Sequence, residues 1–385
     1  MSGTGRAPLL LLTLSIAAVG IQALMLSPLL TDIAAGLGTG PKEIGFAASA
    51  YGVGVASAAL LAAPQLGRWP KRGAIRIAFV VLAGSLLLCA LAWDWRVLAA
   101  AQLGAGLASG VIIPATYALT GDMAPPERRS QDLGKVLFGW SIAMVAGVPL
   151  AAVLSAFLGW RGTFLVVGAV AALMAMGGAL LPRIASHGGL DRVRYADVLR
   201  LPGAWVGYLA TFAYMISFYQ TYTFIGDHVR QTHGAGAWLG GTISLSYGLG
   251  FGAGVVFDKW IDRKGPTRVL PLGLLLVGVN YLVLPFAAET IVTVAAWPFA
   301  WGLANHLCMT ALVSYMNTLS ARMRGTIMGL FSFTTYLSLG TAGAVYGPLY
   351  QSHGFFAVSF ASAATAGLAA LMAWRRGNKL RPGPA

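Results

Sequence analysis

A short basic segment separates two long apolar stretches near the start of the chain. It reads Ala63-Pro64-Gln65-Leu66-Gly67-Arg68-Trp69-Pro70-Lys71-Arg72. A shift of 195 residues places Gly67-Arg68 on Asp262-Arg263, which again separates two apolar stretches. The same shift superposes two later connections of the chain: Arg129 and Gly134 on Arg324 and Gly329, and Gly159 on Gly354. One offset that serves three separate connections indicates an internal duplication.

The composition is that of a membrane protein. Of the 385 residues, 57% are hydrophobic and only 10% are charged, whereas soluble domains carry roughly 25% charged residues. These values exclude a water-soluble enzyme. The two cysteines, Cys89 and Cys308, both lie in apolar runs. We therefore expect no disulfide framework, no metal site and no cofactor.

Twelve apolar segments remain when the chain is divided at charges, prolines and turn residues. A helix needs about 20 apolar residues to cross the hydrocarbon core, and helices satisfy their own backbone groups in lipid. The sequence thus predicts an all-α membrane protein with twelve transmembrane helices, the first of them retained and not a signal peptide. The segments are 9–30, 44–66, 77–93, 97–121, 136–158, 162–181, 204–226, 237–257, 269–288, 291–317, 327–349 and 355–374.

The basic residues are distributed very unequally between the two sides of these segments. The N-terminus, the even-numbered connections and the C-terminus hold 22 of the 26 Lys and Arg residues, and the other connections hold Lys42, Arg96, Arg161 and Arg230. The positive-inside rule then places both termini in the cytoplasm. The net charge of +14 reflects this topology, and we expect no nucleic-acid partner.

The duplication divides the twelve segments into two six-helix bundles that repeat in parallel. We expect an N-terminal bundle over residues 1–181, a cytoplasmic central loop over 182–203 and a C-terminal bundle with a short basic tail over 204–385. Repeats of this kind build transporters whose small-molecule sites lie near the bilayer midplane between the halves. The bundles rock against one another during transport.

Specific motifs then carry a family resemblance. The segment 63–72 is similar to the motif G-x-x-x-D-R-x-G-R-K of the major facilitator superfamily, although Gly67 replaces its aspartate and Pro70 its second glycine. The second copy, residues 262–265, keeps the aspartate. Residues 146–150, followed by 159–164, resemble the sugar-efflux and chloramphenicol-efflux branch of the twelve-span drug:proton antiporters. The resemblance covers essentially the whole chain and implies the major facilitator fold.

Two departures from that branch concern proton coupling. The branch commonly has an acidic residue in the first span, whereas residues 17–23 contain none. An arginine of the fourth span, thought to assist coupling in relatives, aligns with Gln102. Both losses count against the usual proton route.

His306 is the one histidine that the sequence places in the middle of a span, and we place no carboxylate there. A charged group at the bilayer centre costs at least ~2.5 kcal/mol, so an ionisable residue at that depth is a functional candidate. Two interpretations stay open. His306 contacts the substrate or carries the coupling proton, or it is a neutral residue hydrogen-bonded to a neighbouring helix.

The resemblance implies a cavity lined by the first, fourth, seventh and tenth spans. These spans combine aromatic side chains with neutral hydrogen-bonding groups, which suits an amphiphilic or uncharged organic solute. We interpret Tyr222 and Trp297 as anchors at the membrane interface. The predicted substrate contacts are Gln22, Met25, Tyr214, Tyr219, Gln220, Trp301, Asn305, His306 and Met309.

The motif residues of the basic connections are predicted to form a cytoplasmic gate. In relatives the aspartate of this motif caps a helix of the opposite half, which here is the start of the fifth span near Lys135, and the contact stabilises the outward-facing state. We expect Asp122 to pair with Arg68 or Arg72, and Gly67 to weaken the N-terminal copy. The predicted gate residues are Arg68, Arg72, Asp122, Asp262, Arg263 and Gly265.

The sequence thus favours a secondary transporter that exports a small organic compound or drug, coupled to protons or not. A facilitator or importer of a metabolite is the first alternative, and a membrane sensor or intramembrane enzyme is a second. We expect no catalytic residues. We expect a monomer in the lipid bilayer, and the excess of Arg over Lys favours a bacterial inner membrane.

Overall fold

The computed structural model describes residues 6–62, 69–125, 129–184, 194–320 and 323–379. Within these ranges the chain is helical and contains no strand. The first half consists of these elements: α1 (Arg6–Leu24), α2 (Leu26–Gly36), α3 (Pro41–Ala62), α4 (Lys71–Ala90), α5 (Trp95–Met123), α6 (Arg129–Ile142), η1 (Ala143–Gly147), α7 (Val148–Gly177) and η2 (Gly178–Leu180). The second half follows: α8 (Tyr195–Leu199), α9 (Ala204–His233), α10 (Ala237–Ala253), η3 (Gly254–Phe257), α11 (Asp258–Lys264), α12 (Pro266–Ala287), α13 (Ile291–Thr318) and α14 (Arg324–Lys379).

Nine helices of the described ranges are long and apolar enough to cross a membrane. Two of them, Gln131–Leu180 and Thr326–Arg375, are each 50 residues long. Each is kinked at a glycine of positive φ, Gly159 at 68° and Gly354 at 72°, and therefore provides two crossings. Helix α9 adds the last crossing, because its 30 residues span a bilayer although its many Tyr and Thr residues lower its hydropathy. The twelve predicted helices are therefore present.

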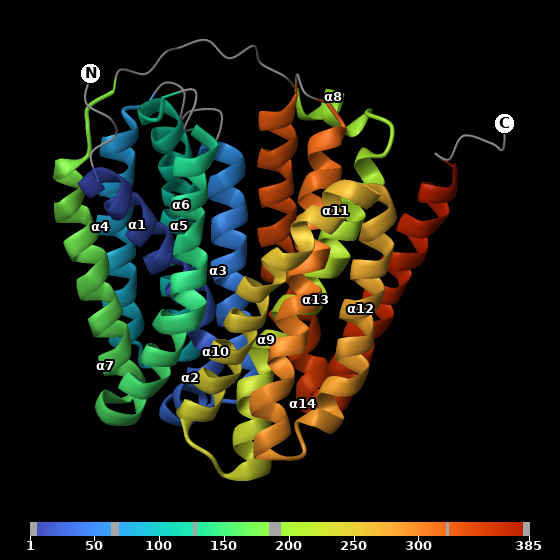
Figure 1. Ribbon diagram of the computed structural model, residues 1–385. Coiled ribbons are helices and arrows are strands. Elements are labelled where there is room, and N and C mark those ends of the chain that lie inside the picture. Colours follow the sequence, from blue (N-terminus) through green and yellow to red (C-terminus); the bar gives the residue numbers. More distant parts are fainter. Residues whose placement is uncertain (1–5, 63–68, 126–128, 185–193, 321–322, 380–385) are drawn as a thin grey trace, which may run out of the picture.

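Figure 1 shows the helices side by side in two groups, with α1, α3, α4, α5, α6 and α7 in one and α9, α11, α12, α13 and α14 in the other. The start of α1, the end of α14, α8 and α11 lie at the same end of the molecule, which we name the terminal face (Figure 1). Helix α2 lies at the opposite end, the distal face, where α7 and α14 turn back at their kinks. The fold is that of two six-helix bundles.

The first span is interrupted, although its sequence predicts one continuous helix. Helix α1 ends at Leu24 and α2 begins at Leu26. Pro28 lacks the N–H that would bond to the Leu24 carbonyl, and its ring crowds that carbonyl. In the fifth span Pro149 similarly follows a π-helical turn, Ala143–Gly147. Met25, between the two helices, keeps right-handed helical dihedral angles (φ −69°, ψ −17°) and its N–H bonds to the Ile21 carbonyl, so the interruption is a kink and not an unwound segment.

Candidate functional site

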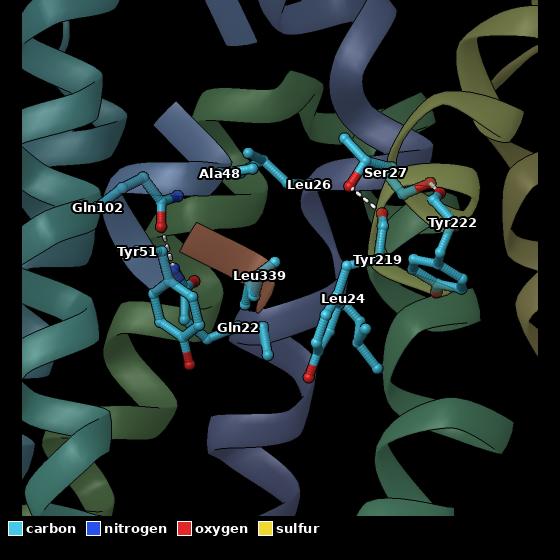
Figure 2. Close-up of a pocket in the computed structure, with 12 residues that line it drawn as sticks. Gln22, Leu24, Leu26, Ser27, Ala48, Tyr51, Gln102, Tyr219, Tyr222 and Leu339 are labelled. Atoms are coloured by element: carbon cyan, nitrogen blue, oxygen red, sulfur yellow. Dashed lines mark hydrogen bonds between the residues drawn. The ribbon is translucent and has the colours of Figure 1, made fainter. Parts of the chain in front are cut away.

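A small cavity lies beside the break between α1 and α2, at the junction of the two halves (Figure 2). Its volume of about 20 Å³ is roughly that of one water molecule. Helices α1, α2, α3 and α5 contribute to it from the first half, and α9 and α14 from the second. The lining residues are Gln22, Ala23, Leu24, Leu26, Ser27, Ala48, Tyr51, Gln102, Tyr219, Tyr222, Thr223 and Leu339.

Two glutamines form a neutral pair in the wall of this cavity. The Gln22 Nε2 donates to the Gln102 Oε1 at 2.7 Å (Figure 2), and both side chains are nearly inaccessible, at 2% and 1% exposure. The Gln22 Oε1 and the Gln102 Nε2 have no partner among the described residues. An unpaired buried amide group is unfavourable. The pair therefore offers one acceptor and one donor to a bound molecule or to water.

Tyrosines form the aromatic part of the wall. Tyr219, a predicted substrate contact, lines the cavity together with Tyr51 and Tyr222. The interpretation of Tyr222 as an interfacial anchor is wrong, since it is 3% exposed and its hydroxyl is 2.7 Å from the Ser244 hydroxyl. Tyr51 and Tyr222 were missed because the sequence does not show which way each helix is rotated.

Four predicted substrate contacts are instead packed inside the second half. The Tyr214 hydroxyl donates to the Asn305 carbonyl at 3.2 Å, and the Gln220 amide donates to the Ser362 hydroxyl. Trp301 is fully buried among rings of α9, α10 and α12, with Tyr247 at 4.9 Å between centroids. Together with Asn305, these residues do not line the cavity in this conformation.

Two predicted methionine contacts do not line it either. Met25 is fully buried at the break itself, and Met309 is half-buried in α13. For all six residues the substrate role stays a prediction.

His306 has a carboxylate partner, which the sequence analysis did not anticipate. Its Nε2 lies 2.9 Å from Oδ1 of Asp258 at the start of α11, and its ring packs edge-on against Phe251. The Asp258 side chain is 42% exposed, so this pair does not place a carboxylate in the middle of a span. The sequence analysis missed the pair because Asp258 follows the last apolar residue of its span.

Removal of this partner provides a direct prediction. In Asp258→Ala the buried His306 Nε2 loses its hydrogen bond, and we expect a lower free energy of unfolding in detergent. In a double-mutant cycle with His306→Gln we expect a coupling energy of about 0.5–2 kcal/mol, the usual size for a polar contact between membrane helices. Asp197→Ala, on the short helix α8, is the matched control. Additive effects of the two changes would contradict a functional or structural pair.

The predicted gate residues are only partly engaged. Asp122 pairs with Lys71, at 2.8 Å between Oδ2 and Nζ, and Lys71 is not among the predicted gate residues. Arg72 is half-buried, and Arg68 lies outside the described residues. The predicted pair of Asp122 with Arg72 is therefore wrong. Lys71, and not Arg72, lies on the face of α4 that is turned towards α5.

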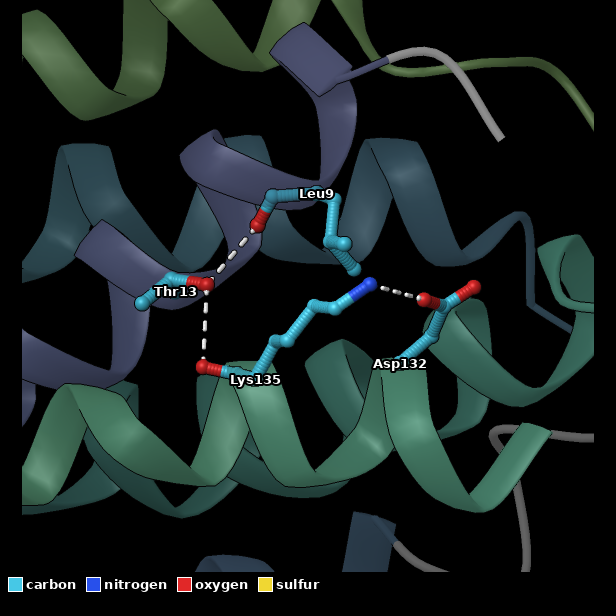
Figure 3. Close-up of polar contacts among 4 residues, drawn as sticks. All are labelled: Leu9, Thr13, Asp132 and Lys135. Carbon is cyan, nitrogen blue, oxygen red and sulfur yellow. Dashed lines mark hydrogen bonds and ion pairs between the residues drawn. The ribbon is translucent and has the colours of Figure 1, made fainter. Parts of the chain in front are cut away.

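The second copy of the motif is exposed in this conformation. Asp262 and Arg263 are accessible in α11, and Gly265, at φ 83°, forms the turn into α12. Figure 3 shows the fifth span near its start, where Lys135 Nζ contacts Asp132 at 3.0 Å and the Lys135 carbonyl accepts from Thr13 at 3.3 Å. Lys135 is thus engaged within the first half.

Polar contacts join the two halves towards the distal face. The Ser27 hydroxyl of α2 donates to the Tyr222 carbonyl of α9. The other contacts, given with their donor–acceptor or ion-pair distances, are Thr31 to Asp227 at 2.7 Å, Arg230 to Asp32 at 2.6 Å, and the Ala344 amide to the Ser49 hydroxyl at 2.8 Å. We name this set of contacts the distal seam.

Glycines let α3 and α14 approach closely in the same seam. A Cβ on Gly343 would lie 2.0 Å from the Gly45 carbonyl oxygen, and one on Gly52 would lie 2.3 Å from the Gly340 nitrogen. Both obstacles are backbone atoms, so no side-chain rotation relieves them. Closure of the seam therefore depends on glycine at these positions.

Comparison with known proteins agrees with this architecture. The family model of the Major Facilitator Superfamily matches residues 12–344. The chain is 30% identical over 368 residues to the uncharacterized MFS-type transporter YwfA of Bacillus subtilis (strain 168), covering 93% of this chain and 89% of that one. It is 29% identical over 350 residues to a chloramphenicol resistance protein of Streptomyces lividans, covering 89% and 87%.

A solved structure shares the fold over its whole length. It is a bacterial homolog of the human lysosomal transporter Spinster, in an inward-facing and unoccupied conformation, with a TM-score of 0.80, 17% identity and complete coverage of both chains. Fold and site together define a membrane transporter built from two helical bundles. The chain belongs to the major facilitator superfamily.

Proposed function

We propose that this protein exports a small uncharged or amphiphilic organic compound across a bacterial inner membrane by alternating access. The observation that carries the proposal is the cavity at the junction of the halves, whose wall combines tyrosine rings with the unpaired amide groups of Gln22 and Gln102. Such a wall binds apolar area and a few neutral polar groups. The proposed unit is a monomer.

The distal seam supports a particular state of the transport cycle. The basic residues assign the terminal face to the cytoplasm, so that the seam closes the outer side. The exposed Asp262 and Arg263 agree with this assignment, since the gate contact expected of them belongs to the outward-facing state. We therefore assign this conformation to the inward-facing part of the cycle.

Sidedness has a simple test. We expect a cysteine in place of Arg263 to react with an impermeant maleimide from the cytoplasmic side, and one in place of Lys42 from the outer side. The chain's own cysteines, Cys89 and Cys308, are buried and serve as the unlabelled background. Reaction of both positions from one side would refute the topology.

Export is supported by the relative whose name denotes resistance to chloramphenicol. The competing function, a facilitator or importer without proton coupling, is favoured by the neutral Gln22–Gln102 pair, because the resembled branch has charged residues in those spans. Direction and coupling are therefore tested together.

We expect purified protein in liposomes, screened over a panel of neutral aromatic drugs, to move at least one of them against its gradient when a pH step is imposed. Transport by alternating access should saturate with substrate and should be lost in Gly343→Ala. Movement only down the gradient, unchanged by the pH step, would support the facilitator instead.

A further inference from the structure

Asp227 is a buried carboxylate in the distal seam, although its position near the end of the seventh span suggested a merely external residue. Its side chain is 1% exposed. The carboxylate accepts hydrogen bonds from the Thr31 hydroxyl, the Gln231 amide and the Tyr350 hydroxyl, each at 2.7 Å. All three donors are neutral. Thr31 belongs to the first half, whereas Gln231 and Tyr350 belong to the second.

The repeat relationship places this contact close to the pseudo-twofold axis. Thr31 and Asp227 are 196 residues apart, and Ser27 and Tyr222 are 195 apart, which matches the offset of the internal duplication. Equivalent positions of two repeats touch one another only near the axis that relates them. Opening of the distal face separates the halves there, so the bond from Thr31 to Asp227 must break in every cycle.

We propose that Asp227 is a proton-binding site through which a proton from the distal side controls the opening of the seam. The proposal rests on the alternating access proposed above and names its coupling residue. An ionised carboxylate accepts hydrogen bonds about twice as strong as those between neutral groups, so ionised Asp227 holds Thr31 and the first half in place. Protonation removes this advantage, and acid therefore favours the open seam.

Desolvation acts in the opposite direction, because closure removes the charge from water. The three donors offset this loss and leave the carboxylate oxygens hydrogen-bonded inside the seam. Only the Thr31 donor is lost on opening as a direct consequence of the separation of the halves. The pH response of the seam should accordingly depend on both Asp227 and Thr31.

Other titratable groups face the same region and define the controls. Arg230 forms an ion pair with Asp32 at 2.6 Å, and their side chains are 20% and 31% exposed. His228 stacks on Phe355. The other described titratable groups at this face are Lys42 and Glu43 at the start of α3, Asp94 and Arg96 at the start of α5, Arg161 beside the kink of α7, His233 at the end of α9, Glu289 after α12, and Tyr350 and His353 on α14.

The test measures the distance between the halves in liposomes. Spin labels are placed on exposed positions of opposite halves, Ala35→Cys in α2 and Thr232→Cys in α9, with Cys89 and Cys308 changed to Ala. Between pH 8 and about pH 3, which extends below the ordinary range of carboxylate titration, the ratio of open to closed seam should rise on acidification by up to about fivefold. Asp227→Asn should show a ratio that does not change with pH, because the amide cannot ionise.

The controls separate the alternatives. Asp32→Asn, His228→Gln and His306→Gln should keep the pH response, whereas Thr31→Val, which removes only the donor of the first half, should weaken it. A normal response in Asp227→Asn, no response in the parent protein, or a response lost in His306→Gln would each overturn the inference. Absence of any change in distance at every pH, with or without substrate, would instead overturn alternating access itself.

Discussion

Gly343→Ala should abolish most transport. The added methyl group would lie 2.0 Å from the Gly45 carbonyl oxygen, so the distal seam cannot close without a shift of α14 against α3. Overpacking of this kind costs about 1–3 kcal/mol, which lowers the ratio of closed to open seam by about 5- to 150-fold. The fold should survive, because each bundle keeps its own contacts.

Accessibility of the cavity measures this effect directly. A cysteine in place of Ala48, which lines the cavity, should react with an outer impermeant maleimide faster in Gly343→Ala than in the parent protein, because the variant spends more time with an open seam. Gly367→Ala is the matched control on the same helix, since its methyl group would meet no atom within 4 Å. Normal transport by Gly343→Ala would show that this approach of the helices is not part of the cycle.

Gln22→Glu should be the most destabilising change in the cavity wall. An ionised carboxylate at a position of 2% exposure, facing the amide of Gln102, has no cation beside it. An uncompensated buried charge costs about 3–5 kcal/mol. We expect a lower free energy of unfolding in detergent and loss of transport of a neutral substrate.

The double variant Gln22→Glu/Gln102→Arg should recover much of that stability. The two atoms that now form the amide pair are 2.7 Å apart, so a carboxylate and a guanidinium can bond there, with the adjoining cavity accepting the longer side chain. Gln351→Glu, at an exposed position of α14, should change stability by less than about 0.5 kcal/mol. Equal losses in the single and double variants would argue against a paired site.

The sequence predicts the helices and their order far better than it predicts the site. Hydropathy and the 195-residue repeat define the spans, because each span must match the bilayer by itself. The bond between Thr31 and Asp227 and that between His306 and Asp258 depend on how helices from distant segments are rotated against each other. A single sequence does not contain this information. Gln22 and Tyr219 were identified because they lie on spans that the family resemblance assigns to the cavity.

The break at Met25 could have been anticipated from Pro28, since proline removes a helical hydrogen bond four residues earlier. The burial of Asp227 could not, because residues 204–226 already account for a complete span and Asp227 follows directly. Its partner on α14, Tyr350, also lies just beyond the expected end of a span. Residues at the ends of spans are therefore where the sequence is least informative about burial.

Gly159 and Gly354 each reverse the chain within a continuous helical run. The fifth and sixth spans, and their counterparts in the second half, are therefore hairpins without a separate connecting loop. Neither turn contains an exposed loop that an antibody or a protease could bind. An epitope inserted at either glycine would interrupt a hairpin. An epitope inserted after Gly234, in the connection between α9 and α10, would interrupt no helix.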